Sequence, residues 1–355
     1  MNPVGLAIVG LGQWAEVLAR VCARTPTVRL VAAYSRNPER RRSFAQRWGC
    51  RAAERLEAVW EAEDVEGVLV TVPNQAHRAV VEAAARHGKG VLVEKPIAAN
   101  WEDGMAIAEA VLRHQIVFAC GHSARRLQGL RALKREVEGG SLGEVNMAVA
   151  LFANERGLDL SPEDWRLEAG QVPGGPLTQL GIHHIDNLQY LLGPIHKVWA
   201  TESPVWRQHN QPLIAHVVLE CAAGPTAYLG ANWASPGTFA LEVFGTRARG
   251  RLEVDYGWWG ASEETDRHSR LEVTELVKET GERYRRSLAT RAVPLSKGDY
   301  LQEEIEEFAA ALRGLARPEV GLKAALENLA VLLAAAESMR AGRPVAVREV
   351  PAEVG

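Results

Sequence analysis

The sequence has little that would tie it to an oxidising compartment or to a membrane. Only four cysteines occur among the 355 residues, at Cys22, Cys50, Cys120 and Cys221, and no two of them form a C-x-x-C pair. This spacing predicts reduced thiols and favours neither a disulfide framework nor a zinc site. No apolar run approaches the roughly 18 residues that a membrane-spanning helix needs. We therefore expect no membrane partner.

An excess of charge of one sign is also absent. The formal net charge of -3 provides no basic surface for nucleic acid or for an anionic membrane. The N-terminal stretch VGLAIVG is apolar and lacks the basic region of a signal peptide, which predicts a cytoplasmic protein. An apolar fraction of 47% is ordinary for a soluble globular protein. Single cores rarely grow past roughly 250 to 300 residues, so the length predicts two domains.

The N-terminal region follows a strand, turn, helix, strand plan. Val4 to Val9 and Val28 to Tyr34 are apolar runs typical of buried strands, and Glu16 to Arg24 between them is helical in pattern. Apolar strands alternate with amphipathic helices further on, with strands expected in residues 65–74 and 90–96. This alternation predicts an α/β fold with a doubly wound parallel sheet.

The turn after the first strand reads GLGQWA, which is a G-x-G-x-x-A pattern. Gly10 would permit the tight turn, Gly12 would let the backbone approach a pyrophosphate, and Ala15 would keep the helix close to the sheet. Gln13 and Trp14 begin the helix, whose N-terminus supplies amide donors to phosphates. A dinucleotide site is therefore predicted; a tight turn without a ligand is the alternative.

The end of the second strand bears on which dinucleotide is bound. NAD enzymes usually carry Asp or Glu about 20 residues after the glycines, where it binds the ribose 2′-hydroxyl. Here the residues are Tyr34, Ser35, Arg36 and Asn37, and Arg40 follows one helical turn later. A hydroxyl followed by arginines would accept a 2′-phosphate, which favours NADP over NAD. The alternative is that Arg36 is a solvated loop residue.

Ligands of doubly wound sheets bind at the carboxyl ends of the strands. We therefore expect cofactor contacts from the residues that end the two later strands, which are Thr71, Pro73, Asn74, Glu94, Lys95 and Pro96.

These and later motifs together resemble the Gfo/Idh/MocA oxidoreductase family. The resemblance is collinear over nearly the whole chain and rests on GLGQWA (10–15), TVPNQAH (71–77), VLVEKPIA (91–98), GHSARR (121–126), LGEV (142–145), GGPLTQLGIHHID (174–186) and GDYLQEEIEEFAAAL (298–312). It implies a Rossmann domain at residues 1–123 and an α+β domain at 124–355. The second domain would carry a large, open, mostly antiparallel sheet, and the last helices would pack back on the first domain.

The resemblance also implies a reaction and its residues. Members move hydride between a nicotinamide and a carbon of a sugar or cyclitol. Lys95 and His183 would lie at the reacting carbon, and His77 and Arg125 near cofactor or substrate. The open sheet would make a homodimer or homotetramer.

Two positions depart from the family pattern. Many members have Asp four residues before the histidine, where this chain has Gln179, which cannot take a proton. An aromatic residue often follows the arginine of GHSARR, where this chain has Arg126, which favours an anionic substrate.

The later part of the chain has the period-2 pattern of antiparallel strands. Strands are expected in residues 145–153, 215–222 and 226–234, and a hairpin in 242–255, whereas the polar segment 258–270 predicts a loop or a ragged hairpin.

A helix containing the stretch IHHID would place a polar stripe along one face. That stripe consists of Gln179, His183, Asp186, Asn187 and Tyr190. Within it, the Asp186 carboxylate can support the His183 imidazole. His184 points about 100° away and is expected to be a hydrogen-bonded core residue.

Other site chemistries are disfavoured. Adjacent histidines diverge on a helix, so no metal site is expected, and a Ser/His/Asp hydrolase would need a G-x-S-x-G elbow, which is absent. Trp165 and Arg166 lie just before the glycines of the histidine motif and are candidates for contacts to a sugar ring and a substrate anion, together with Arg125.

The sequence thus predicts an NAD(P)-dependent oxidoreductase of a sugar, sugar acid or cyclitol. His183 and Lys95 would act on the reacting oxygen, and Gln179 and Asp186 would orient the histidine and a neighbouring hydroxyl. Two alternatives stay open: a nucleotide-binding sensor or structural subunit without redox turnover, and an enzyme that uses tightly bound NAD with no net redox change.

Overall fold

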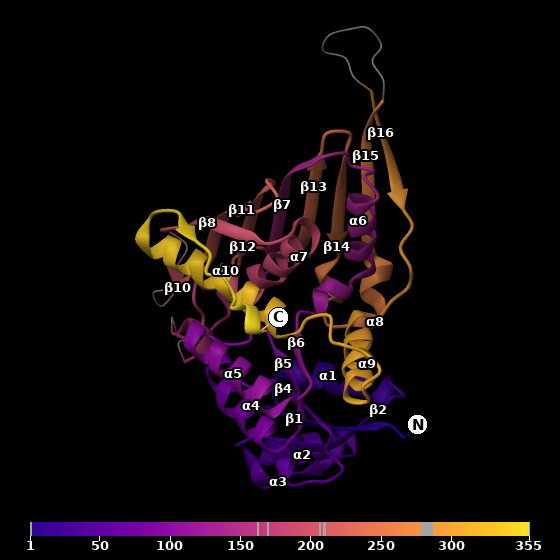
Figure 1. Cartoon of the computed structure of the whole chain (residues 1–355), viewed down its shortest axis with the longest axis vertical. Coiled ribbons are helices and arrows are strands. Elements are labelled where there is room, and N and C mark those ends of the chain that lie inside the picture. The colour runs from indigo at the N-terminus through magenta and orange to yellow at the C-terminus, as the bar shows by residue number, and fades with distance from the viewer. Residues whose placement is uncertain are drawn as a thin grey trace. The chain divides into compact units, whose positions relative to one another are not determined.

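A computed structural model describes residues 2–161, 163–168, 170–205, 207–208, 211–277 and 287–354 (Figure 1). The chain divides into two compact units. Unit 1 consists of residues 1–123, 301–330 and 349–355, and unit 2 consists of residues 124–300 and 331–348. No helix among the described residues combines the length and the hydropathy needed to cross a bilayer.

Unit 1 is built on a six-stranded parallel sheet in the order β3-β2-β1-β4-β5-β6. Its strands are β1 (Val4–Val9), β2 (Val28–Tyr34), β3 (Arg51–Ala52), β4 (Gly67–Val70), β5 (Gly90–Glu94) and β6 (Phe118–Gly121). Strands β1 and β4 are buried along their whole length, as expected for a parallel sheet covered on both faces. This strand order is that of the dinucleotide-binding α/β fold, so the predicted Rossmann sheet is confirmed.

The helices of this unit include segments that are distant in sequence. They are α1 (Gln13–Arg24), α2 (Pro38–Trp48), α3 (Glu57–Trp60), α4 (His77–Arg86), α5 (Trp101–His114) and α9 (Tyr300–Leu312), with the first part of α10 (Leu322–Ala341). Helix α9 packs tightly over β4, because a Cβ atom on Gly67 would lie 2.7 Å from the Leu312 side chain and 2.9 Å from Phe308. An ion pair between Arg313 and Glu66 continues this contact.

Unit 2 is built on a nine-stranded sheet in the order β16-β15-β14-β13-β7-β12-β11-β8-β17. Its strands are β7 (Val145–Ala153), β8 (Ile195–Glu202), β11 (Ile214–Cys221), β12 (Thr226–Asn232), β13 (Thr238–Gly245), β14 (Ala248–Val254), β15 (Ser269–Val277), β16 (Ser287–Val293) and β17 (Val345–Ala346). Only the β12–β7 pair is parallel among the strand pairs of this sheet in the described chain. A separate two-stranded sheet joins β9 (Arg207–Gln208) and β10 (Gln211–Pro212). The predicted open, mostly antiparallel sheet is confirmed.

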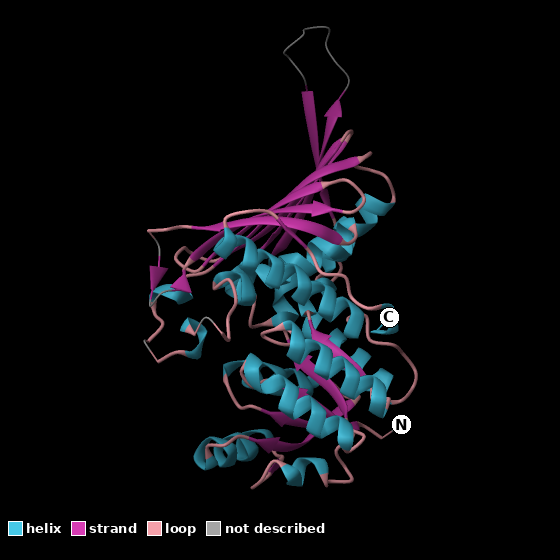
Figure 2. Cartoon of the chain, turned by 60° about the vertical axis from the view of Figure 1, so that its left-hand side comes forward, coloured by secondary structure: helices cyan, strands magenta, loops and turns pink. Residues whose placement is uncertain are grey.

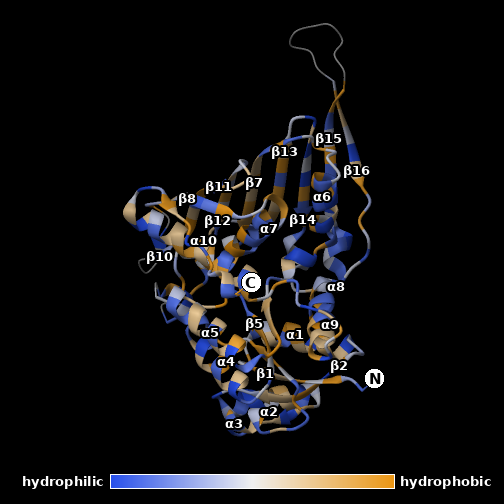
Figure 3. Cartoon of the chain, in the orientation of Figure 1, coloured by the Kyte–Doolittle hydropathy of each residue, from blue (hydrophilic) through white to orange (hydrophobic). Residues whose placement is uncertain are grey.

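One face of this large sheet is covered by helices, namely α6 (Gln128–Glu138), α7 (Ile182–Leu192) and the last part of α10 (Figure 2). Helix α6 packs so closely that a Cβ atom on Gly129 would lie 2.4 Å from the Leu252 side chain of β14. Hydrophilic and hydrophobic residues alternate along the strands (Figure 3), as expected for strands with one face in a core. The opposite face leaves Met147, Leu151 and Trp199 at least 40% exposed.

Two segments differ from the expectations. Residues 258–270, expected as a loop or ragged hairpin, contain α8 (Ser262–Thr265) and single helical turns on either side, before β15 begins at Ser269. Side-chain hydroxyl groups stabilise these turns: Thr265 donates to the Trp258 carbonyl oxygen at 2.9 Å and Ser269 donates to the Thr265 carbonyl oxygen at 2.7 Å. The histidine helix is not regular at its start, because residues Leu177–Gly181 form a π-helical turn.

Candidate functional site

The glycine turn after β1 is tight at one glycine and open at the other. Gly10 has a φ of +96°, and a Cβ atom there would lie 2.6 Å from the Val72 nitrogen. Its amide donates to the Tyr34 carbonyl oxygen at 3.0 Å, and its carbonyl oxygen accepts from the Thr71 hydroxyl at 2.5 Å. A Cβ atom on Gly12, in contrast, would have nothing within 4 Å. Open space beside the N-terminus of α1 suits a pyrophosphate, so these residues fit a dinucleotide.

The two glycines are expected to respond differently to alanine. Gly10→Ala should destabilise the chain, because the new methyl group meets backbone atoms at a positive φ. Gly12→Ala should leave the thermal midpoint near that of the wild type and weaken nucleotide binding at least about tenfold, since its methyl group fills the space for the phosphates. Thermal unfolding and a fluorescence titration with NADPH separate the two effects. Equal losses of stability would contradict this interpretation of Gly12.

The loop after β2 is fixed by hydrogen bonds that leave two arginines exposed. The Asn37 side chain caps α2 by accepting from the Arg40 amide at 2.9 Å, and the Ser35 hydroxyl accepts from the Asn37 amide at 3.3 Å. The Arg41 side chain, which the sequence analysis did not single out, donates to the Ser35 carbonyl oxygen at 2.9 Å and is 9% exposed. Arg36 and Arg40 remain exposed beside this capped helix N-terminus. The loop therefore offers two exposed cations to a ligand.

His77 connects the loops that follow β4 and β5. It is fully buried, with Nδ1 3.1 Å from the Pro96 carbonyl oxygen and Nε2 3.0 Å from the Val72 carbonyl oxygen. Burial lowers the pKa of His77, which favours a neutral imidazole. His77 thus links the loop that carries Asn74 to the loop that carries Lys95.

Glu94 and Trp14 join the end of β5 to the glycine turn. The indole nitrogen of Trp14 donates to a Glu94 carboxylate oxygen at 2.5 Å, and a Cβ atom on Gly121 would lie 3.0 Å from the same oxygen. Burial raises the pKa of Glu94 to about 7, against the opposing effects of Lys95 and the Trp14 hydrogen bond. Lys95 follows directly and begins the loop at the carboxyl end of the strand.

The raised pKa of Glu94 predicts how stability depends on pH. Because this pKa is about 7 in the folded chain against an ordinary 4.5, the folded state holds a proton that the unfolded state releases. The associated stability is fully present below about 4.5 and is lost as the pH rises through about 7. Glu94→Gln should therefore gain stability relative to wild type across that window, as chemical denaturation at several pH values would show. If the stability difference between Glu94→Gln and wild type does not change with pH, the raised pKa assigned to Glu94 is wrong.

The π-helical turn changes the predicted polar stripe of unit 2. Gln179 lies within the turn and is partly exposed, whereas His183 and Asp186 lie in the regular helix α7 and are 6% and 1% exposed. The spacing of Gln179 from His183 is therefore not that of an α-helix. Single π-turns of this kind are frequent at functional sites.

Asp186 forms a buried ion pair with Arg125. Arg125 Nε donates to one carboxylate oxygen at 3.0 Å and Nη2 donates to the other at 2.5 Å, and the side chains are 11% and 1% exposed. Both residues were predicted as site residues, but no local pattern in the sequence pairs them, since they are 61 positions apart. This two-point geometry is the strongest arrangement open to an arginine and a carboxylate.

His183 lies against aromatic rings that the sequence analysis missed. Its ring centroid is 5.5 Å from that of Phe152 and 5.4 Å from that of Trp259. Phe152 could have been found as an inward residue of a period-2 strand, but Trp259 lies in the segment expected to be an irregular loop. The His183 imidazole therefore lies against the aromatic rings of Phe152 and Trp259.

The adjacent His184 is a core residue, as expected. It is fully buried, its Nε2 lies 3.1 Å from the Leu151 carbonyl oxygen, and Asn187 contacts its other ring nitrogen at 3.4 Å. Burial lowers the pKa of His184 to about 4, so it is uncharged at neutral pH.

Trp165 and Arg166 lie together in one short turn. The Arg166 guanidinium carbon is 4.6 Å from the centre of the Trp165 ring, and Nη1 lies 3.2 Å from an Asp164 oxygen. Burial, followed by the neighbouring Arg156, lowers the pKa of Arg166. Its Nε is buried without a hydrogen-bond partner in the described part of the chain. Arg166 is thus a cation with unused hydrogen-bonding capacity.

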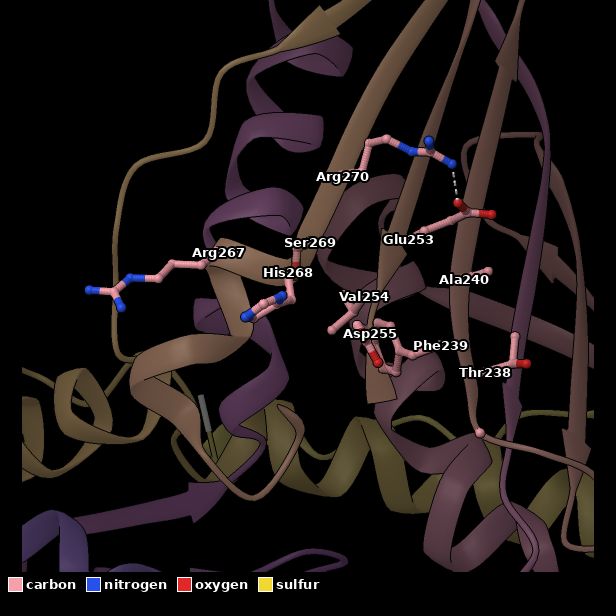
Figure 4. Close-up of a pocket in the computed structure, with 11 residues that line it drawn as sticks. Thr238, Phe239, Ala240, Glu253, Val254, Asp255, Arg267, His268, Ser269 and Arg270 are labelled. Carbon is pink, nitrogen blue, oxygen red and sulfur yellow. Dashed lines mark hydrogen bonds and ion pairs between the residues drawn. The ribbon is translucent and has the colours of Figure 1, made fainter. Parts of the chain in front are cut away.

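A hollow of about 520 Å³ opens elsewhere in unit 2, beside the ends of β13 and β14 (Figure 4). None of the site residues predicted from the sequence lines this hollow. Three of its charged side chains are in ion pairs, because Glu253 pairs with Arg270 at 2.8 Å and Arg267 pairs with Glu264. Asp255 accepts a hydrogen bond from the Gly257 amide at 2.9 Å. Within the described ranges, no group of three His, Cys, Asp or Glu side chains is arranged to hold a metal ion.

Two protein-family models match this chain. The model described as an oxidoreductase family with an NAD-binding Rossmann fold matches residues 4–122, and a GFO/IDH/MocA C-terminal domain model matches residues 130–251.

Curated relatives include a reductase and a hydratase. The 2,7-anhydro-N-acetylneuraminate hydratase of Mediterraneibacter gnavus is 31% identical over 54% of this chain and 50% of its own length. A dTDP-3,4-didehydro-2,6-dideoxy-alpha-D-glucose 3-reductase of Streptomyces antibioticus is 31% identical over 64% of this chain and 68% of its own length. The alignments span about half the length of several of these relatives.

Solved structures match almost the whole chain. A Desulfitobacterium hafniense protein, solved as a candidate NADPH-dependent oxidoreductase, is 41% identical with a TM-score of 0.91 over 98% of both chains. A levoglucosan dehydrogenase in complex with NADH and L-sorbose has a TM-score of 0.84 at 20% identity, over 99% of this chain and 100% of its own, which shows a shared fold.

Proposed function

Because this chain belongs to the Gfo/Idh/MocA oxidoreductase family, we propose that it transfers hydride between a nicotinamide cofactor and a sugar, sugar acid or cyclitol. The observation that carries this proposal is the glycine turn, where Gly12 opens a space at the N-terminus of α1. The names of several relatives, which are dehydrogenases and reductases of sugars or of inositol, support the substrate class.

The proposed roles of the residues follow from their chemistry. In the direction of oxidation, His183 removes the proton of the substrate hydroxyl group. Lys95 donates a hydrogen bond to the same oxygen and stabilises its alkoxide character. A bound nicotinamide would supply the acceptor for the hydride that leaves the same carbon. Gln179 orients a neighbouring hydroxyl group, and Asp186 helps to hold the turn of α7 that carries His183.

Arg166 is the arginine we propose for a substrate anion, with Trp165 beside it as a surface for the sugar ring. Arg125 already has its charge matched by Asp186 at two points. The Nε donor of Arg166, by comparison, has no hydrogen-bond partner in the described part of the chain, and its ion pair with Asp164 is partly exposed.

For the cofactor we propose NADP rather than NAD. Ser35, Arg36 and Arg40 offer a hydroxyl and two exposed cations beside the N-terminus of α2, and residues 34–37 include no carboxylate to repel a phosphate. The Desulfitobacterium hafniense neighbour, solved as a candidate NADPH-dependent oxidoreductase, supports this choice.

A titration with NADPH and NADH tests the choice of cofactor. Wild type should bind NADPH more tightly, and Arg36→Ala should weaken NADPH roughly tenfold or more while changing NADH by less than about twofold. Arg42→Ala, at an exposed position on α2, is the matched control. Equal binding of NADH and NADPH by the wild type would contradict the proposal.

A second candidate function is an overall non-redox reaction that uses a tightly held NAD. Two relatives are named hydratases, and adding or removing water leaves no net redox change. This candidate predicts product formation without accumulation of reduced nicotinamide. A nucleotide-binding sensor, in contrast, predicts cofactor binding and no product.

We also propose that the chain forms a homodimer or homotetramer through the open face of the large sheet. Met147, Leu151 and Trp199 are 43%, 40% and 44% exposed on this face, which is typical of a surface that is covered in an assembly. Light scattering of the purified chain tests this proposal, and the mass of a single chain would contradict it.

A further inference from the structure

Tyr190 lies one helical turn after Asp186 on α7, and two cations lie over its ring. The Arg125 guanidinium carbon is 5.1 Å from the centre of the ring, and Lys134 Nζ is 4.4 Å from it. Lys134 also donates to the Tyr190 carbonyl oxygen at 2.7 Å. Tyr190 therefore touches the same arginine that holds Asp186.

The Arg125–Asp186 pair depends on orientation. A two-point contact forms only when the guanidinium group and the carboxylate are nearly coplanar. An aromatic ring at cation–π distance restricts how the guanidinium group can tilt, and such contacts strengthen as they become desolvated. With Arg125 11% exposed, water is poorly placed to replace either partner.

We propose that Tyr190 is a positioning residue, which holds the Arg125 guanidinium in the plane that satisfies both Asp186 oxygens and so fixes the turn of α7 that carries His183. Asp186 lies three positions after His183, so both residues share one face of the helix. A displaced Asp186 would shift the backbone of this turn and, with it, the imidazole. The inference rests on the proposed function, because His183 is the group whose place is set.

Four single variants and one double variant test the proposal. Tyr190→Leu removes the ring and should lower kcat about tenfold, the size of one desolvated cation–π contact, with the affinity for NADPH unchanged. Tyr190→Phe keeps the ring and should restore kcat to within about twofold of wild type. Arg125→Lys keeps the charge but loses the planar fork, and adding Tyr190→Leu to it should cost nothing further. Lys134→Met removes the other cation and should change kcat by less than about twofold.

The outcomes separate this inference from the proposed function. If the losses from Tyr190→Leu and Arg125→Lys multiply, or if Lys134→Met costs as much as Tyr190→Leu, Tyr190 does not act through Arg125. The His183 ring resonances, assigned with His183→Gln, should shift in Tyr190→Leu and not in Tyr190→Phe. Shifted resonances in a chain without sugar turnover would support the positioning role and remove only the proposed function. Unshifted resonances would overturn the inference.

Discussion

Replacing His183 or Lys95 by alanine is expected to lower sugar turnover about 10²- to 10⁴-fold. This is the usual contribution of a positioned proton-transfer group, and a donor to a developing alkoxide contributes similarly. Steady-state assays with saturating cofactor measure the loss. For His183→Ala, NADPH binding should stay within a few-fold of wild type, because the glycine turn lies in the other unit of the chain.

Matched controls are available for both substitutions. His114 is exposed in the last turn of α5 and Lys323 is exposed near the start of α10, so alanine at either position should leave turnover unchanged. If His183→Ala and Lys95→Ala both turn over near the wild-type rate, the assignment of the two roles is wrong.

Arg125→Met is expected to destabilise the chain by about 3 to 5 kcal/mol. It leaves the Asp186 carboxylate buried without its charged partner, and breaking a buried pair in this way costs far more than the pair itself contributes. Denaturant unfolding measures the loss. Adding Asp186→Leu should recover much of the stability, because the uncompensated charge is then removed.

An exposed ion pair in unit 1 supplies the comparison. Arg51 and Asp64 also pair at two points, with both distances 2.6 Å, but their side chains are 54% and 39% exposed. Arg51→Met should cost no more than about 1 kcal/mol. Equal costs for the two arginine substitutions would mean that burial does not determine the cost at Arg125.

Several strands of the two sheets could be predicted because the pattern of apolar residues that defines each of them is local in the sequence. The apolar runs of β1 and β2 were assigned from sequence with the bounds that the structure has, and β7 likewise. The strand expected at residues 65–74 is shorter, Gly67–Val70, because residues 71–74 contain Pro73 and lead into a helical turn that begins at Asn74. Fold class and family followed from such runs and from the motifs between them.

The side-chain contacts of the candidate site could not be predicted in the same way. The partner of Asp186 lies 61 positions away, and that of Glu94 lies 80 positions away, so no local pattern encodes either pairing. The π-helical turn before α7 broke the regular period on which the polar stripe was built. Trp259 reaches His183 from a segment whose helical turns depend on hydroxyl contacts that periodicity does not reveal.

The most direct test of the central claim is to incubate the purified chain with NADP and a panel of sugars, sugar acids and cyclitols while following the near-ultraviolet absorbance of reduced nicotinamide. If the chain is such an oxidoreductase, absorbance rises with at least one substrate, in proportion to the carbonyl product formed, and His183→Ala abolishes most of the rise. A product that forms without any change in absorbance, or cofactor binding without any product across the panel, would contradict it.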